Sequence, residues 1–128
     1  MRTVVIPRAD WRAKLDEFSS VHEGWRVSLD LLTPELGAQP EIDDLPLRGV
    51  AAEVGAREST ITIAAGSTGT DQITHTIHAP RRVQLEQSDA GADVALEIES
   101  SDHAKAILRF TSPALPETVD GLPRKFPR

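Results

Sequence analysis

The sequence has no cysteine and no tyrosine, and aromatic residues make up only 4% of its 128 positions. Without cysteine, the chain cannot form a disulfide scaffold, a thiolate zinc site, an iron–sulfur cluster or a cysteine nucleophile. Few aromatic rings also leave few platforms on which nucleic-acid bases or sugars could stack. These absences exclude several classes of protein and leave an ordinary folded domain as the simplest interpretation.

Long hydrophobic runs are also missing. No stretch approaches the roughly 20 apolar residues that a membrane-spanning helix needs. Near the start of the chain the apolar run covers only residues 4–6, which is too short for the hydrophobic region of a secretory signal peptide. We therefore expect a cytoplasmic protein with no membrane partner.

Positive charge is scarce and unevenly distributed. The net charge of −6 argues against a general binder of nucleic-acid backbones, because such binding needs clustered lysine and arginine. Residues 41–104 carry a net charge of −8, whereas residues 105–128 carry +3. We expect the basic end, residues 123–128, to be a solvated tail, and contact with RNA is the alternative.

The remaining composition suits a single soluble domain over residues 1–128. Single domains commonly hold about 100–150 residues, and a chain of this length can bury a core without a disulfide or a metal. Hydrophobic residues make up 39% and charged residues 27%, as in ordered soluble proteins. Four prolines beyond position 111 predict an irregular tail over residues 111–128.

The first predicted element is a helix over residues 8–22. Mostly apolar side chains recur there at spacings of four, three and four residues, which is one face of a helix with about 3.6 residues per turn. These residues are Trp11, Leu15, Phe18 and His22. Pro7 suits the start of this helix, and Gly24 suits its end.

After Gly24 the pattern changes to alternation with a period of two, which is typical of strands buried on one face. The predicted strands cover residues 25–32, 45–54, 60–65, 72–78, 81–87, 94–100 and 105–110. Prolines, a glycine and acidic residues predict a loop over residues 33–44. In the second strand the inward positions change parity at Gly49, which predicts a β-bulge.

Two hairpins can be placed in register. Pairing Ile61 with Ile77 puts His75 on the inner face and threonines on the outer face, and the next hairpin pairs Val83 with Ile98. One helix followed by six or seven antiparallel strands predicts an α+β fold that is mainly β. We expect the helix to pack on the sheet, and the bent sheet to curl into a small barrel.

His75 is the most informative single residue. Its position faces inwards between Ile73 and Ile77, where an unsatisfied imidazole would cost free energy. His75 could be a general base, a ligand or a pH switch in a cavity. The alternative is a hydrogen-bonded histidine in the core or at an edge, and we favour this alternative because no catalytic partner can be identified. His78 lies three positions further along the strand and points to the opposite face, so no metal site is predicted.

The other candidate residues for a ligand or partner surface are His22, Trp25, His78, Arg81 and Arg82. The outer threonines of the first hairpin could present a flat polar surface, although threonine on an exposed strand needs no function to explain it. Glu97 and Glu99 have a spacing compatible with paired catalytic carboxylates. Cross-strand ion pairs with basic neighbours explain the two glutamates better.

Several short segments, taken in order, resemble a known family. They are Ile6-Pro7-Arg8…Trp11, His22-Glu23-Gly24-Trp25, Leu45-Pro46-Leu47-Arg48-Gly49-Val50, Thr74-His75-Thr76-Ile77…Ala79-Pro80, Ala95-Leu96-Glu97-Ile98-Glu99-Ser100 and Leu115-Pro116-Glu117-Thr118-Val119-Asp120-Gly121. Together they resemble the bacterial domain of unknown function 5335 over almost the entire chain. The resemblance implies a stand-alone bacterial cytoplasmic protein and carries no activity, cofactor or catalytic residue.

The sequence favours a non-catalytic interaction or accessory module that binds a protein partner or a small polar ligand. No nucleophile–base pair, cluster of metal ligands or phosphate-binding loop is visible, so we expect no cofactor and assign no catalytic residue. A small hydrolase or isomerase built around His75 is the alternative. A third hypothesis is an RNA- or ribosome-associated protein that uses the basic tail with Arg81 and Arg82.

Overall fold

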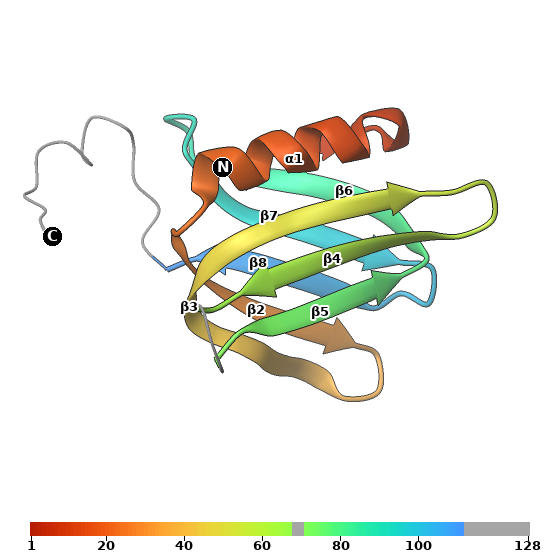
Figure 1. The fold of residues 1–128 in the computed structure, drawn as a ribbon. Coiled ribbons are helices and arrows are strands. Elements are labelled where there is room, and N and C mark those ends of the chain that lie inside the picture. The colour runs from red at the N-terminus through yellow and green to blue at the C-terminus, as the bar shows by residue number, and fades with distance from the viewer. Residues whose placement is uncertain (68–70, 112–128) are drawn as a thin grey trace, which may run out of the picture.

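The computed structural model describes residues 1–67 and 71–111, which hold one α-helix and eight antiparallel strands (Figure 1). The elements are β1 (Arg2–Ile6), the 3₁₀ turn η1 (Arg8–Asp10), α1 (Trp11–His22), β2 (Arg26–Thr33), β3 (Gly37–Val54), β4 (Ser59–Ala65), β5 (Ile73–His78), β6 (Pro80–Gln87), β7 (Asp93–Ser100) and β8 (Lys105–Phe110). No helix in this part of the chain is long and apolar enough to cross a membrane. The predicted α+β class, mainly β, is confirmed. The basic end at residues 123–128 lies outside the described residues.

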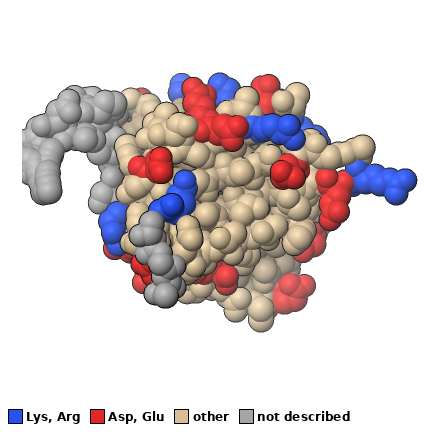
Figure 2. Space-filling model, in the orientation of Figure 1, with Lys and Arg blue, Asp and Glu red and all other residues tan. Residues whose placement is uncertain are grey.

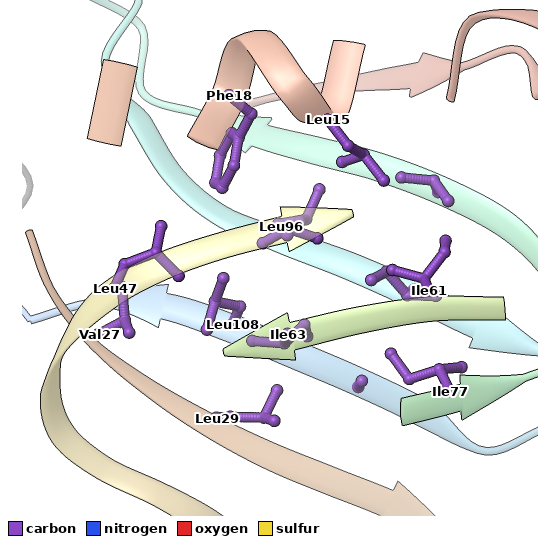
Figure 3. Packing of buried hydrophobic residues seen from close by; sticks show 14 of the residues in the cluster. Leu15, Phe18, Val27, Leu29, Leu47, Ile61, Ile63, Ile77, Leu96 and Leu108 are labelled. Atoms are coloured by element: carbon purple, nitrogen blue, oxygen red, sulfur yellow. The ribbon is translucent and has the colours of Figure 1, made fainter. Parts of the chain in front are cut away.

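The strands form one sheet in the order β1-β6-β7-β8-β2-β3-β4-β5. β3 belongs to both halves of this sheet, because its first part pairs with β2 and its second part, from Leu47, pairs with β4. The predicted bulge is confirmed by a register shift between Leu47 and Gly49. In Figure 1 the sheet folds over along β3, so that β4 and β5 lie in front of β2, β7 and β8. Buried apolar side chains fill the space between these layers (Figure 3).

Both predicted hairpin registers are confirmed. Ile61 lies opposite Ile77 in the β4–β5 pair, and this pairing places His75 on the inner face. Val83 lies opposite Ile98 in the β6–β7 pair. Alternation therefore gives the correct register wherever one face of a strand pair is buried.

The number of strands and the closure of the sheet differ from the prediction. The sheet has eight strands instead of six or seven, because residues 2–6 form β1, in which only Ile6 is buried and no alternation marks the strand. The predicted loop over residues 33–44 is a turn followed by the start of β3, where residues 37–41 are all exposed. The predicted small barrel is wrong. Among the described strands, β1 and β5 each pair with one neighbour only and form the two free edges of an open sheet.

Helix α1 explains why the sheet need not close. The helix lies across the open side of the folded sheet, and its Leu15 and Phe18 point into the core beside Leu96 (Figures 1 and 3). Burial of each such side chain contributes about 1.5–3 kcal/mol. The helix thus covers the side of the core that, in a barrel, would be enclosed by pairing between the two edge strands.

Hydrogen bonds fix the position of α1. The indole Nε1 of Trp11 donates to the carbonyl oxygen of Ile6 at 3.0 Å. The backbone N–H of Val50 donates to the Ser19 hydroxyl at 2.7 Å, and this hydroxyl lies 2.9 Å from the carbonyl oxygen of Val50. One end of the helix is therefore attached to β1 and its middle is attached to β3.

Gly66 is a position at which the fold depends on glycine. Its φ is 120°, and a Cβ there would lie 2.4 Å from the carbonyl oxygen of Asp71. Gly66→Ala should lower the free energy of unfolding by roughly 1–3 kcal/mol in urea titrations. Gly49→Ala is the matched control, because a Cβ there meets only Ser19 at 3.6 Å and the change should stay within about 0.5 kcal/mol. Equal losses in both variants would contradict this account of the two glycines.

Candidate functional site

A groove of about 560 Å³ lies between α1 and the inner face of β1 and β6. Its apolar walls come from β1, the turn after it, α1 and β6: Val4, Val5, Ile6, Pro7, Phe18, Val21 and Leu85. Because α1 is anchored to β3 through Ser19, its other flank is left beside β1. The size of the groove falls within the range of about 300–1,000 Å³ that is typical of ligand pockets.

The mouth of the groove is unusually apolar for a sheet edge. Val4, Val5 and Val21 have exposed fractions of 36%, 49% and 60%. Natural edge strands are commonly protected by lysine, proline or a bulge, because unpaired backbone groups recruit other strands. β1 is short and is flanked by Arg2 and Pro7, but residues 3–6 between them contain no charged residue, proline or bulge.

A buried aromatic cluster with one imidazole closes an end of the groove. The His22 side chain is 5% exposed, and its ring centroid lies 4.5 Å from that of Phe18 and 4.7 Å from those of Trp25 and Phe110. The Nδ1 of His22 donates to the carbonyl oxygen of Phe18 at 2.8 Å. Its Nε2 lies 3.3 Å from Oδ2 of Asp93.

The contact with Asp93 continues as a polar network towards the surface. Gln87 Nε2 donates to Asp93 Oδ1 at 2.8 Å, and Arg2 Nη2 donates to Gln87 Oε1 at 2.7 Å. The hydrogen bond from His22 is the main reason why the pKa of Asp93 lies below its usual range. Burial opposes this effect, and the bond from Gln87 adds to it. The network links β1, β6, β7 and the last residue of α1.

Both ring nitrogens of His22 are engaged, and this limits its chemistry. Nδ1 must carry a proton to donate to a carbonyl, so Nε2 can donate to Asp93 only when the ring carries two protons. To reach either nitrogen, a substrate would have to displace the carbonyl oxygen of Phe18 or the carboxylate of Asp93. The buried His22 and the half-buried Asp93 are therefore best explained as a structural pair that joins α1 to β7.

The other predicted histidine lies elsewhere. The His75 side chain is 24% exposed, and its Nδ1 lies 3.8 Å from Oε1 of Glu41. It lines a hollow of about 190 Å³ together with Ser100 and Asp102. The Ser100 hydroxyl donates to Asp102 at 2.5 Å, and in residues 1–67 and 71–111 no hydrogen bond joins His75 to a serine or threonine hydroxyl. The arrangement supplies a histidine and a carboxylate but no activated nucleophile.

The six predicted site residues are not brought together. Trp25 packs beside His22, as described above, and His75 and His78 line the same small hollow. Arg81 shares a second hollow with His78. Arg82 lies on the outer face of β6, where its Nε donates to Gln84 at 3.0 Å and it lines a polar hollow with both predicted glutamates, Glu97 and Glu99.

The threonine face is present but flat. Thr62 lies opposite Thr76 on the outer side of β4 and β5. Figure 2 shows that few charged side chains cover the front of the molecule and that most lie towards its rim. Threonine on an exposed strand needs no ligand to explain it, and this face adds nothing that would hold one.

The sequence patterns do not point to Asp93, Gln87 or the valines of β1. Asp93 and His22 are distant in the sequence, and no spacing connects them. Val21 offers the one local signal, because it is an apolar residue on the exposed side of α1, next to the buried His22. The groove could therefore be found only from the packed structure.

The sequence model of a family of unknown function, DUF5335, matches residues 2–118. The chain belongs to this family. Among related proteins, an uncharacterized protein of Aquifex aeolicus (strain VF5) is 27% identical over 116 residues, which cover 91% of this chain and 97% of that protein. No solved structure matches this DUF5335 protein. The resemblance seen in the sequence is confirmed, and the comparisons add no activity.

The lowered pKa of Asp93 makes the stability of this DUF5335 protein depend on pH. Because the folded-state pKa lies below the unfolded-state pKa, ionised Asp93 stabilises the fold above the unfolded-state value, and this contribution is lost as the pH falls through the folded-state value. Asp93→Asn should lower the free energy of unfolding by about 1–3 kcal/mol near neutral pH. The difference from wild type should shrink below about pH 4.

Urea unfolding of both proteins across the acidic range measures this effect. Asp16→Asn, on the exposed side of α1, is the control and should unfold like the wild type at each pH. A penalty for Asp93→Asn that stays constant into strong acid would contradict the ionic role of Asp93.

Proposed function

We propose that this protein is a non-catalytic binding module that takes up an extended, apolar segment of a partner protein along β1. The observation that carries the proposal is an edge strand, paired with β6 on one side only, that has two exposed valines and lies beside an apolar groove. Recognition by strand addition combines backbone hydrogen bonds with pockets for alternate side chains, and both parts are present here.

The geometry of a strand suits this groove. In an added strand, successive side chains point to opposite faces of the sheet. Every second side chain would then point to the face on which Val4 and Leu85 form the floor and Val21 of α1 forms the wall. The groove would accept apolar side chains, while the intervening residues stay in solvent.

The charges of the groove favour an uncharged segment. Its two basic side chains, Arg2 and Lys14, are balanced by Glu17 and Asp93. Lys14 lies 3.6 Å from Glu17, and Asp93 is engaged by the polar network. An apolar peptide without strong charge therefore matches this surface better than an acidic or a basic one.

The edge at β1 suits strand addition better than the edge at β5. Exposed positions of β5 are threonine and histidine, with Ile73 as its one exposed large apolar residue. β1 has two exposed valines, of which Val4 shares the groove face with Leu85, and Val21 of α1 adds a third exposed valine to the lining of the groove. The relative from Aquifex aeolicus supports a bacterial origin for this protein. We place the binding in the cytoplasm, as the family resemblance implies.

Selection of peptides from a random phage-displayed library tests this function with the full chain as bait. Selected peptides should carry apolar residues at alternate positions, and they should shift the amide NMR signals of β1 and Val21. The double variant Val4→Glu, Val21→Glu should weaken their binding by about tenfold or more, since both exposed side chains line the groove.

Leu36→Glu is the matched control, because Leu36 is also an exposed large apolar residue but lies in the turn before β3. It should bind the selected peptides like the wild type. Peptides that instead shift the amide NMR signals of β5, or of the threonines on the outer face of β4 and β5, would overturn the proposal. So would a stable dimer of the chain that the double variant dissociates, because a second copy would then be the occupant.

A further inference from the structure

We propose that a second site, on the side of Arg8, Arg57 and Arg81, binds a phosphate group carried by a small molecule. These arginines line one hollow of about 370 Å³, which we call the arginine hollow. Its remaining lining residues are Glu58, Ser59, His78, Ala79, Pro80 and Ser101. None of them lines the groove at β1, so this site is independent of the proposed function.

The charge of the arginine hollow sets it apart. Three arginines face one acidic residue, Glu58, in a protein whose net charge is −6. Four other hollows formed by described residues hold equal numbers of basic and acidic side chains. Among these five hollows of the described residues, the arginine hollow is therefore the one with an excess of positive charge.

The three arginines also lack partners of opposite charge. In the described part of the chain, Arg26 and Arg109 form ion pairs with aspartates. Arg8, Arg57 and Arg81 form none, like several other surface arginines, but these three share one hollow. With Glu58 as the one carboxylate beside three guanidinium groups, the hollow keeps an excess of positive charge, and like charges repel one another. An anion bound between them would relieve this repulsion.

Arg8 is held in place before any ligand arrives. Its Nη2 donates to the hydroxyl of Ser59, whose residue is buried, and its guanidinium lies 4.9 Å from the centre of the Trp11 ring. A fixed guanidinium loses little freedom on binding, and its fork of N–H donors matches the oxygens of a phosphate.

Backbone hydrogen bonds hold the loops that carry the other residues. Ala79 donates to the carbonyl oxygen of Ser59 at 3.1 Å, and Ser101 donates to that of Ala79 at 2.9 Å. These bonds join the start of β4, the β5–β6 connection and the β7–β8 turn. The hollow is therefore built on a rigid framework rather than on a single loop.

The surroundings favour a small ligand over a nucleic acid. Residues 41–104, which supply most of the hollow, carry a net charge of −8. A long polyanion would place its further phosphates against this acidic surface. A single phosphate group with a few attached atoms fits both the positive charge and the volume.

Titration of the full chain with inorganic phosphate, followed by amide NMR at constant ionic strength, tests the site. Signals of Ser59, Ala79 and Ser101 should shift and saturate. Arg57→Gln together with Arg81→Gln should weaken phosphate binding by about tenfold or more, because two exposed charges are removed while the fold is kept. Arg48→Gln, an exposed arginine outside the hollow, is the matched control and should bind as the wild type does.

Shifts that do not saturate, or that potassium chloride reproduces, would overturn the proposal. Equal weakening in Arg48→Gln would also overturn it, because it would show a general charge effect. If a short RNA binds far more tightly than phosphate, and the double variant loses this binding, then the ligand of the hollow is a nucleic acid and the proposal of a small molecule is wrong.

Discussion

Burial of one face of α1 against the folded sheet determines how the core is closed and where the groove lies. Leu15 and Phe18 enter the core from the open side of the sheet, and Ser19 fixes the helix to Val50 of β3. Because the helix completes the core, the sheet stays open and keeps two edges. Because the helix is held towards β3, its opposite flank and β1 enclose a groove. The binding surface thus follows from the way the core is closed.

The polar network ties that surface to the core. As an edge strand, β1 pairs only with β6, and Arg2 gives it a further connection through Gln87 and Asp93 to the buried His22. A pair of this kind, with His22 buried and Asp93 half-buried, stabilises little by itself, but loss of Asp93 leaves the buried imidazole without its partner. The groove therefore has a fixed end. The arginine hollow shares no lining residue with it and lies where the turn after β1 meets the starts of β4 and β6.

The sequence predicts those parts of the fold that repeat a local period. The face of α1 and the pairing of Ile61 with Ile77 follow from spacings of 3.6 and two residues, because burial on one side imposes them. β1 could not be predicted because its residues are mostly exposed and show no alternation. The open sheet could not be predicted because closure depends on where the helix packs. The candidate site is less predictable still. His22 is found from its helical spacing, but the pairing with Asp93 arises only when distant strands meet.

The proposed function requires that β1 accept a further strand. Nuclear Overhauser contacts between an isotope-labelled chain and a bound peptide selected for alternating apolar residues test it most directly. We expect regular backbone-to-backbone contacts between the peptide and residues 2–6, with alternate peptide side chains near Val4 and Val21. Contacts that reach side chains of the groove without a backbone ladder along β1, or that lie at β5, would contradict it.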